Sequence, residues 1–172
     1  MGRRCARFRE FPNGSLPHSH LATIIGPIVQ RKDGHVAQYS GGCFCGAVRY
    51  EISEQPVRSF QCQCRDCQKD SGAGHSCVMV FARSALRVTG EVRETLRTAD
   101  SGERKRKGFC PQCGTPIYNK PDSKPDFIGI YVGSLDNASA FKPDVVLFAA
   151  HGHPWDYLDP AVPKIPQWHG SS

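Results

Sequence analysis

From Tyr39 onward, short stretches of alternating apolar and polar residues follow one another, separated by Gly, Pro, Asp and Asn. The alternation is clearest at Val48, Tyr50 and Ile52, which take every second position as in a strand with one buried face. Apolar runs and weaker alternations predict further strands at Cys77–Phe81, Leu86–Val88, Thr95–Arg97, Phe127–Val132 and Val145–Ala149. Because no helical apolar period persists for three turns, the sequence predicts a mainly β domain.

The composition fits a single domain with a packed core. The chain has 172 residues, of which 39% are hydrophobic and 9% aromatic. Seventeen glycines and thirteen prolines are spread along it, as expected for many short strands joined by turns. We expect the C-terminal stretch from Pro154 to form an ordered meander anchored by Trp155 and Trp168.

The first 38 residues differ from the rest of the chain. Four arginines precede an apolar run at Leu21–Val29, which resembles an export sequence, but Glu10 and two prolines interrupt the approach. We expect residues 1–38 to be a poorly ordered N-terminal extension or the product of a misassigned start, and residues 39–172 to form the domain. No stretch reaches the ~20 apolar residues of a membrane helix, so we expect no membrane partner and a cytoplasmic location.

Nine cysteines carry the most specific chemistry of the sequence. An odd number, arranged in tight groups, fits a metal site in a reducing compartment better than a set of disulfides. Seven of them lie in three short motifs: Cys43 and Cys45 in GGCFCG, Cys62, Cys64 and Cys67 in CQCRDC, and Cys110 and Cys113 in FCPQCG. Zinc holds sulfurs in a tetrahedron with edges of roughly 3.8 Å, so each motif must bend sharply to bind it.

The first and third motifs each offer two thiolates. Together, Cys43, Cys45, Cys110 and Cys113 complete the four-sulfur shell of a structural zinc ion. Such an ion would tie together segments 65 residues apart and contribute directly to folding. The alternative is two independent reactive or redox pairs.

The middle motif offers three thiolates, Cys62, Cys64 and Cys67, and no fourth cysteine close by. Three protein ligands with one exchangeable position are typical of catalytic zinc. Three thiolates also make the ion a mild Lewis acid that suits a soft ligand such as a substrate thiolate. The alternative is a closed structural site completed by one further side chain from His75, Cys77, His151 or His153.

These motifs resemble the GFA family, named for the glutathione-dependent formaldehyde-activating enzyme, which includes a centromere-protein-V-like branch. The resemblance rests on GGCFCGAVRY, CQCRDCQKDSGAG, FCPQCGTPIY and the late Pro154-Trp155 pair, and it runs from about Tyr39 to Trp168. It implies a complex fold of several coiled antiparallel β-sheets around two Zn²⁺ ions, one structural and one catalytic, on the cysteines named above. The family often has Cys-His-Cys in the middle motif, whereas Gln63 takes the central place here.

By the same resemblance, the chain is expected to be a carbon–sulfur lyase acting on a small thiol adduct such as S-hydroxymethylglutathione, formed from glutathione and formaldehyde. Zinc would serve as template and Lewis acid. No residue identifies itself as the general acid or base. Asp66, inside the middle motif, and Lys69, just after it, flank the expected metal site and could assist, although charged loop residues are usually only solvated.

Two other functions are compatible with the sequence. One is a zinc-stabilised binding module for protein or nucleic acid in which both metals are structural. The other is a thiol redox protein using Cys110 and Cys113. The basic run Arg104–Lys107 could bind a substrate carboxylate or nucleic acid, or could form a solvated hairpin tip.

The net charge of +6 gives little support to a nucleic-acid partner. Seven thiolates and two zinc ions together remove three positive charges and leave about +3. We therefore expect no nucleic-acid partner, and the partner that the family resemblance implies is a small thiol such as glutathione. The pattern does not indicate an oligomeric state.

Overall fold

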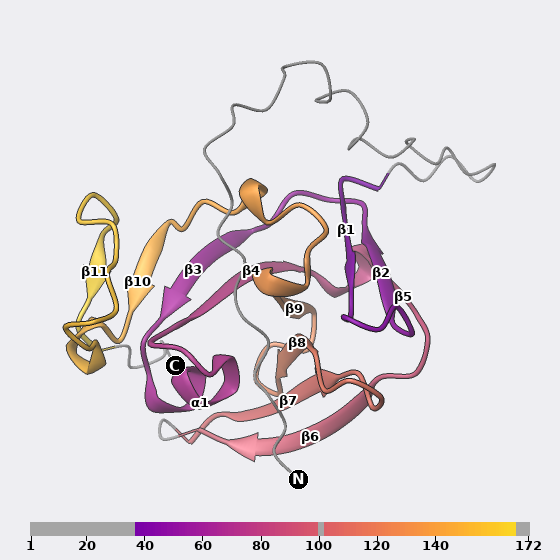
Figure 1. The fold of residues 1–172 in the computed structure, drawn as a ribbon, viewed down its shortest axis with the longest axis horizontal. Helices are drawn as coiled ribbons and strands as arrows, with labels where there is room; N and C mark the ends of the chain where they lie inside the picture. The colour runs from indigo at the N-terminus through magenta and orange to yellow at the C-terminus, as the bar shows by residue number, and fades with distance from the viewer. Residues whose placement is uncertain (1–36, 100–101, 168–172) are drawn as a thin grey trace, which may run out of the picture. The chain divides into compact units, whose positions relative to one another are not determined.

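The computed structural model describes residues 37–99 and 102–167. This part of the chain contains eleven strands and a single α-helix, α1 (Arg65–Ser71), which lies at one side of the domain (Figure 1). The strands are β1 (Tyr39–Gly42), β2 (Arg49–Ile52), β3 (Arg58–Cys62), β4 (Ser76–Ala82), β5 (Leu86–Thr89), β6 (Arg93–Thr98), β7 (Arg104–Phe109), β8 (Pro116–Pro121), β9 (Phe127–Tyr131), β10 (Val145–Leu147) and β11 (Lys164–Ile165). Short 3-10 helices lie at Arg83–Ala85, Val132–Ser134, Ala138–Ala140 and Ala149–His151.

The strands form two sheets, which confirms the prediction of a mainly β fold. The smaller sheet has the order β1-β2-β5, and the larger has the order β11-β10-β3-β4-β9-β8-β7-β6. Nearly all neighbouring strands are antiparallel, but β10 runs parallel to both β3 and β11. The antiparallel arrangement implied by the family resemblance therefore holds everywhere except at this edge of the larger sheet.

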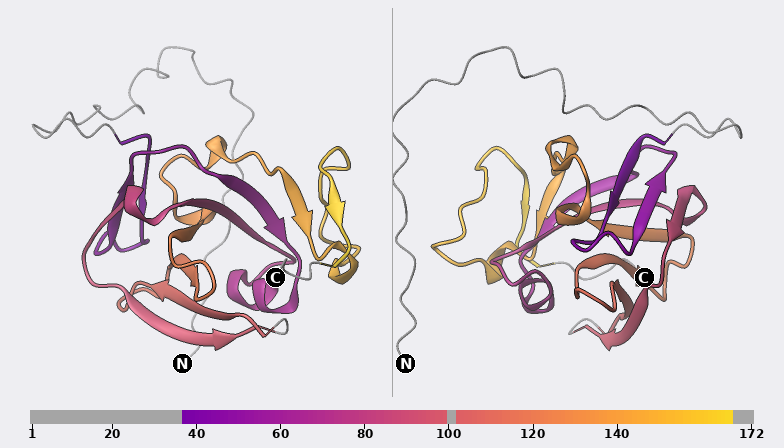
Figure 2. Two further views of the ribbon diagram at one scale, coloured as in Figure 1. Left: turned by 180° about the vertical axis from the view of Figure 1, so that it is seen from behind. Right: turned by 45° about the vertical axis from the view of Figure 1, so that its right-hand side comes forward.

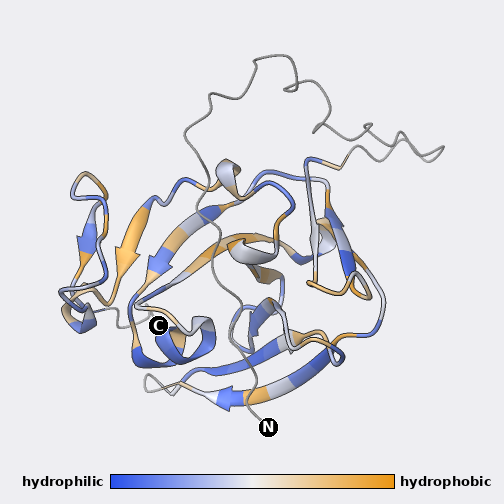
Figure 3. Ribbon diagram, in the orientation of Figure 1, coloured by the Kyte–Doolittle hydropathy of each residue, from blue (hydrophilic) through white to orange (hydrophobic). Residues whose placement is uncertain are grey.

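The core lies between the two sheets. Val48, Tyr50 and Ile52 are 0–2% exposed, as their alternation predicts. They pack with Met79 and Phe81 of β4, both almost completely buried. Figure 3 shows the hydrophobic colouring of β4 and β10 against the hydrophilic colouring of much of β6 and β7. The larger sheet thus has an apolar centre and one strongly polar end.

Some sequence predictions need correction. The basic run Arg104–Lys107 is not a hairpin tip but part of β7, because the turn of the β6–β7 hairpin is closed earlier by the Ala99 N–H bond to the Glu103 carbonyl. The strand expected over Val145–Ala149 ends at Leu147, because Phe148 has a positive φ of 54°. Trp155 does not anchor the C-terminal stretch in the core, since it is 69% exposed.

The expected N-terminal extension falls almost entirely outside the described residues, and so does Trp168. No helix in the described ranges has the length and apolar character needed to span a membrane. Both views in Figure 2 show α1 and the β1–β2 hairpin on opposite sides of the domain. The middle cysteine motif leads into α1 and the first one forms the β1–β2 loop, so the fold holds these motifs apart.

Candidate metal centres

The first cysteine cluster joins the β1–β2 loop to the β7–β8 loop. In the first loop, the Gly46 N–H donates to the Cys43 carbonyl at 3.1 Å, and Gly46 has a φ of 78°. In the second, the Gly114 N–H donates to the Cys110 carbonyl at 2.9 Å, and Gly114 has a φ of 74°. These glycines permit the tight turns that direct both sulfurs of each motif to one side.

Four sulfurs meet at this point, those of Cys43, Cys45, Cys110 and Cys113, all within 4.8 Å of one another. The Cys43–Cys45 and Cys45–Cys110 sulfur distances are 3.5 and 3.7 Å, close to the edge of a zinc–sulfur tetrahedron, about 3.8 Å. Cys43 also accepts the Val48 N–H at 3.2 Å, which favours its thiolate. This donor set fits a four-coordinate zinc ion. The geometry thus brings together the two motifs that were paired from sequence.

Hydrogen bonds from one threonine favour the thiolate of Cys113. Its sulfur lies 3.1 Å from the Thr115 hydroxyl oxygen. That hydroxyl, followed by the Thr115 backbone N–H, lowers the pKa of Cys113 to about 5. Because metal binding requires deprotonated thiols, this environment prepares the loop for a cation.

The second cluster forms where β3 ends and α1 begins. Cys62 is the last residue of β3, Cys64 is the N-cap of α1, and Cys67 lies in its first turn. The cap residue and the residue three positions later are neighbours at a helix start, so the CRDC spacing brings two sulfurs together. All three sulfurs lie within 4.8 Å of one another. The sharp bend predicted for the motif is therefore the start of a helix.

Electrostatics at this second cluster favour a thiolate at Cys64. Its sulfur accepts the Cys67 N–H at 3.4 Å. Hydrogen bonds from the Cys62 and Cys67 thiols are the main cause that lowers the pKa of Cys64, and the positive charge of Lys105 adds to it. Burial opposes the shift. One thiolate shared among three close sulfurs is an arrangement that a divalent cation would stabilise further.

A buried hydroxyl beside this cluster supports its fit to a metal ion. Ser76 is 2% exposed and lies opposite Cys62 in the β3–β4 pairing. Its oxygen faces Cys67 and has no hydrogen-bond partner among the described residues. A buried polar atom without a partner is costly, so it indicates a polar or charged group at this site.

The four side chains considered as a fourth ligand do not join the three sulfurs. Within the described residues, the group of ligand atoms that could share an ion contains only Cys62, Cys64 and Cys67. The Nδ1 atom of His75 instead forms a hydrogen bond with the Asp156 carboxylate, at 2.8 Å. His153 lies 3.1 Å from the Gln68 side-chain oxygen. Cys77 and His151 also lie outside the group. Among the residues that the structure describes, no further side chain fills the fourth corner of a tetrahedron here.

Two residues that the sequence did not single out hold α1 in place. The buried Gln68 donates to the Gln63 carbonyl at 2.7 Å and to the His151 carbonyl at 3.0 Å. Asp70 accepts bonds from Lys107 at 2.8 Å and from the Tyr131 hydroxyl at 3.2 Å. Apart from Gln63, these partners lie far from α1 in sequence, so no local pattern could have revealed them.

The basic run divides between the two faces of β7. Arg104 and Arg106 each lie 3.5 Å from Asp122. On the other face, Lys107 is paired with Asp70, and the charge of Lys105 acts on Cys64. Lys105 therefore makes only a minor electrostatic contribution at the three-cysteine cluster.

The two charged residues considered as proton-transfer groups, Asp66 and Lys69, have no side-chain partner among the described residues. The side chains of Asp66 and Lys69 make no hydrogen bond or ion pair with other residues of the described part. Neither is therefore positioned by the fold for proton transfer, and the general acid and base remain unassigned.

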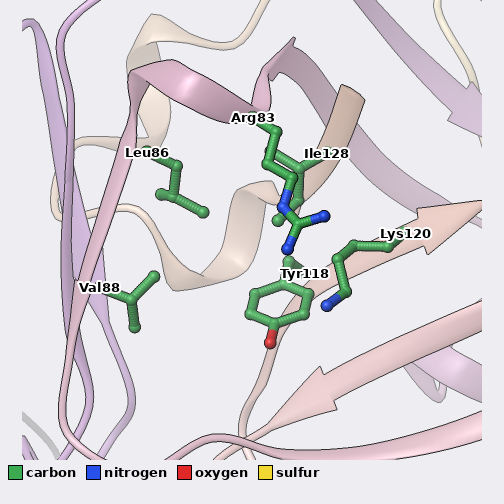
Figure 4. A pocket seen from close by; sticks show the side chains of 6 residues that line it. All are labelled: Arg83, Leu86, Val88, Tyr118, Lys120 and Ile128. Carbon is green, nitrogen blue, oxygen red and sulfur yellow. The ribbon is translucent and has the colours of Figure 1, made fainter. Parts of the chain in front are cut away.

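A shallow cavity of about 260 Å³ lies away from the cysteines, and it is lined by Arg83, Leu86, Val88, Tyr118, Lys120 and Ile128. Figure 4 shows Arg83 and Lys120 extending toward the Tyr118 ring. Lys120 is already paired with Glu94 at 2.5 Å and lies over the Tyr118 ring at 5.3 Å. Because no cysteine lines this cavity, the thiol chemistry is better placed at the three-cysteine cluster.

A mainly β domain with a four-sulfur and a three-sulfur cluster defines a class of cysteine-rich proteins able to hold two metal ions. The model of the GFA family, described as glutathione-dependent formaldehyde-activating enzyme, matches residues 38–151. The chain therefore belongs to the GFA family, which confirms the resemblance found from its motifs.

Three relatives carry the same enzyme name as a provisional designation. The protein of Halomonas elongata is 25% identical over 114 residues, covering 62% of this chain and 71% of its own. The proteins of Sordaria macrospora and Podospora anserina are 28% and 29% identical, over 49% and 51% of this chain. The matches span only 35% and 42% of these two fungal proteins.

A solved structure is also similar. The crystal structure of a Rhodobacter sphaeroides protein is 25% identical to this chain and aligns with a TM-score of 0.45. The alignment covers 57% of this chain and 88% of that protein.

Proposed function

We propose that this chain is a zinc-dependent carbon–sulfur lyase that acts on a small thiol adduct such as S-hydroxymethylglutathione. The observation that carries the proposal is the difference between the two cysteine clusters. One gathers four sulfurs, and the other gathers three with no further protein ligand within reach in the described residues. Membership of the GFA family supports the same reaction class.

In this proposal, Cys43, Cys45, Cys110 and Cys113 hold a structural zinc ion that ties two distant loops together. Cys62, Cys64 and Cys67 hold the catalytic ion, which would supply Lewis acidity and a binding position for the thiol sulfur. Two ions per chain are expected. The cytoplasm, where thiols stay reduced, is the location that we propose for such a site.

The reaction breaks the carbon–sulfur bond of a hydroxymethyl thiol adduct. The sulfur keeps the bonding electron pair and leaves as a thiolate, and the carbon becomes the carbonyl carbon of formaldehyde. The hydroxyl proton is transferred to the thiolate, directly or through solvent, which gives the thiol. The chain's own residues bind and orient the adduct. In this proposal, Lys105, whose positive charge acts on Cys64, attracts an anionic part of the adduct such as a carboxylate.

Cobalt substitution tests the proposal directly. Cobalt bound to thiolates absorbs light according to its ligands, so adding glutathione to the cobalt-loaded protein should change the spectrum. The same addition to the Cys64→Ser variant should change it much less. A spectrum that responds to none of the thiols tried would contradict the lyase and favour a zinc-stabilised binding module with two structural metals.

The role of Lys105 has a matched control on the same strand. We expect Lys105→Met to raise the glutathione concentration needed for the spectral change by about tenfold, as for the loss of one charge-assisted hydrogen bond. Arg104→Met removes a charge from the opposite face of β7 and should leave that concentration within about twofold. Equal effects of the two variants would show that only net charge matters.

The two metal sites should respond differently to mutation. Cys110→Ser should lower solubility and the free energy of unfolding, because the four-sulfur site ties distant loops. Cys64→Ser should leave the fold more intact and abolish the activity. Metal content, measured by plasma mass spectrometry, should fall from two zinc ions per chain to about one in either variant. Equal collapse of both variants would argue that neither ion is available for chemistry.

A further inference from the structure

A second group of reactive side chains lies at the same end of β3 and β4 but on their other face. In the β3–β4 pairing, Cys62 lies opposite Ser76, and Gln61 lies opposite Cys77. Since successive side chains of a strand point to opposite faces, Cys77 and Gln61 project away from the three-cysteine cluster. His75 precedes Cys77 by two positions and shares its face.

Hydrogen-bond contacts link these side chains to the carboxylate of Asp156. His75 Nδ1 lies 2.8 and 2.9 Å from the two carboxylate oxygens of Asp156. His75 Nε2 lies 3.2 Å from the amide nitrogen of Gln61, and this nitrogen lies 3.9 Å from the sulfur of Cys77. A carboxylate on Nδ1 leaves Nε2 as the nitrogen that can exchange a proton with a neighbouring thiol.

The fold holds the carboxylate against the imidazole from two further sides. Asp156 accepts a hydrogen bond from the Gln63 side-chain nitrogen at 3.1 Å. A Cβ atom at Gly74 would lie only 2.3 Å from the Asp156 carboxyl carbon. Only glycine at position 74 lets the carboxylate approach this closely, so the backbone is shaped around the pair.

Burial makes this contact stronger than a surface ion pair. The side chains of His75 and Asp156 are 19% and 10% exposed. The pKa of His75 is raised to about 9, first by the Cys77 thiol and also by Asp156, while burial opposes the shift. Cys77 and Asp156 are the titratable groups that raise the pKa of His75 most. Cys77 keeps partial access to solvent.

We propose that Cys77 is a nucleophilic thiol, with His75 as its base and Asp156 as the residue that orients the imidazole, and that it adds to small uncharged electrophilic carbon compounds. This site is separate from the two metal centres and does not depend on the lyase reaction.

In the reacting pair, the Cys77 proton already lies on His75 Nε2, and with an aldehyde the sulfur forms a bond to the carbonyl carbon. The π electron pair moves to the oxygen, which then takes the proton back from the imidazolium, so no oxidant is needed. Gln61 lies beside both groups and can donate an N–H to that oxygen. With an alkyl iodide, the sulfur–carbon bond forms as iodide leaves, and His75 keeps the proton.

Limited alkylation with iodoacetamide tests the proposal on the full zinc-loaded chain. Peptide mapping by mass spectrometry gives the rate at each cysteine between pH 6 and 9. A synthetic peptide of residues 71–81 is the reference, because it contains His75 and Cys77 without Asp156. At pH 7, Cys77 in the folded protein should react at least tenfold faster than Cys77 in the peptide.

Variants test whether Cys77 reacts fast because His75 and Asp156 activate its thiol or only because it is exposed to solvent. Asp156→Asn and His75→Asn should each lower the Cys77 rate at pH 7 at least fivefold and move its pH profile toward that of the peptide. Zinc content shows whether each variant keeps its fold. If either variant loses zinc, the proposal is judged only by the Cys77 rate in the wild-type protein compared with the rate in the peptide. A Cys77 rate in the wild-type protein equal to or below that of the peptide would overturn the proposal.

Discussion

Replacing Asp70 by asparagine tests how the helix of the three-cysteine cluster is held. The Asp70 carboxylate lies 2.8 Å from the ammonium group of Lys107 on β7, and both side chains are 14% exposed. It also accepts a hydrogen bond from the hydroxyl of Tyr131 on β9. Arg97 is a third partner at 2.8 Å, but its side chain is 51% exposed. Asparagine keeps the shape and some hydrogen bonding but removes the charge.

The size of the effect follows from the burial of Lys107. At 2.8 Å and an effective dielectric constant of about 20, the pair attracts by ~6 kcal/mol before desolvation is counted. Breaking a buried pair by removing one partner usually costs about 3–5 kcal/mol, because the other charge stays unpaired. The exposed Arg97 adds little. We therefore expect Asp70→Asn to lower the free energy of unfolding by about 3 kcal/mol.

Urea unfolding of the zinc-loaded protein at fixed free zinc measures the loss. Asp122→Asn is the matched control, since its partners Arg104 and Arg106 are 57% and 45% exposed, and it should cost less than about 1 kcal/mol. Adding Lys107→Met to Asp70→Asn should recover about 2 kcal/mol by removing the unpaired charge. A loss below about 0.5 kcal/mol for Asp70→Asn, or no recovery in the double variant, would refute the reasoning.

Three further predictions concern the core and the pH dependence of stability. Phe81→Ala removes a fully buried ring and should cost about 3–5 kcal/mol in urea unfolding, whereas a loss under 1 kcal/mol would contradict its central place. Gly41→Ala would put a Cβ 2.2 Å from the Tyr50 hydroxyl oxygen and 2.3 Å from the Ser134 carbonyl, so a lower melting temperature is expected, and an unchanged one would count against this packing. The raised pKa of His75 stabilises the fold below its ordinary value of 6.5, and this contribution is lost as pH rises through about 9. His75→Asn should therefore destabilise more at pH 6 than at pH 9.5, and a constant difference would contradict the shift.

Local patterns predicted the features that depend on local geometry. The alternation at Val48, Tyr50 and Ile52 marks a strand because each apolar side chain enters the core. The two C-x-C and C-x-x-C loops could be paired from sequence because four sulfurs suffice for one shell, and the fold brings them together. In these places, the sequence separation of the partners did not matter, because the chemistry of the thiols indicated the contact.

Other features depend on contacts that no local pattern contains. Helix α1 has only seven residues, too few to display an apolar period, and it is held by remote partners of Gln68 and Asp70. The parallel pairing of β10 arises from a long connection rather than a hairpin. The pairing of His75 with Asp156 joins residues 81 positions apart, and neither residue type indicates it from sequence.

The order in which this chain is synthesised has a consequence for the three-cysteine cluster. Gln68 is fixed by His151 and His153, which follow it by 83 and 85 residues. At about 5–20 residues per second, a ribosome needs roughly 4–17 s to add that stretch. During this interval, the nascent chain displays three closely spaced thiols on a segment that still lacks the contacts of Gln68 with the two histidines. Oxidants, stray metal ions and thiol-reactive compounds in the cell therefore meet these cysteines first on the ribosome, before the completed domain encloses them.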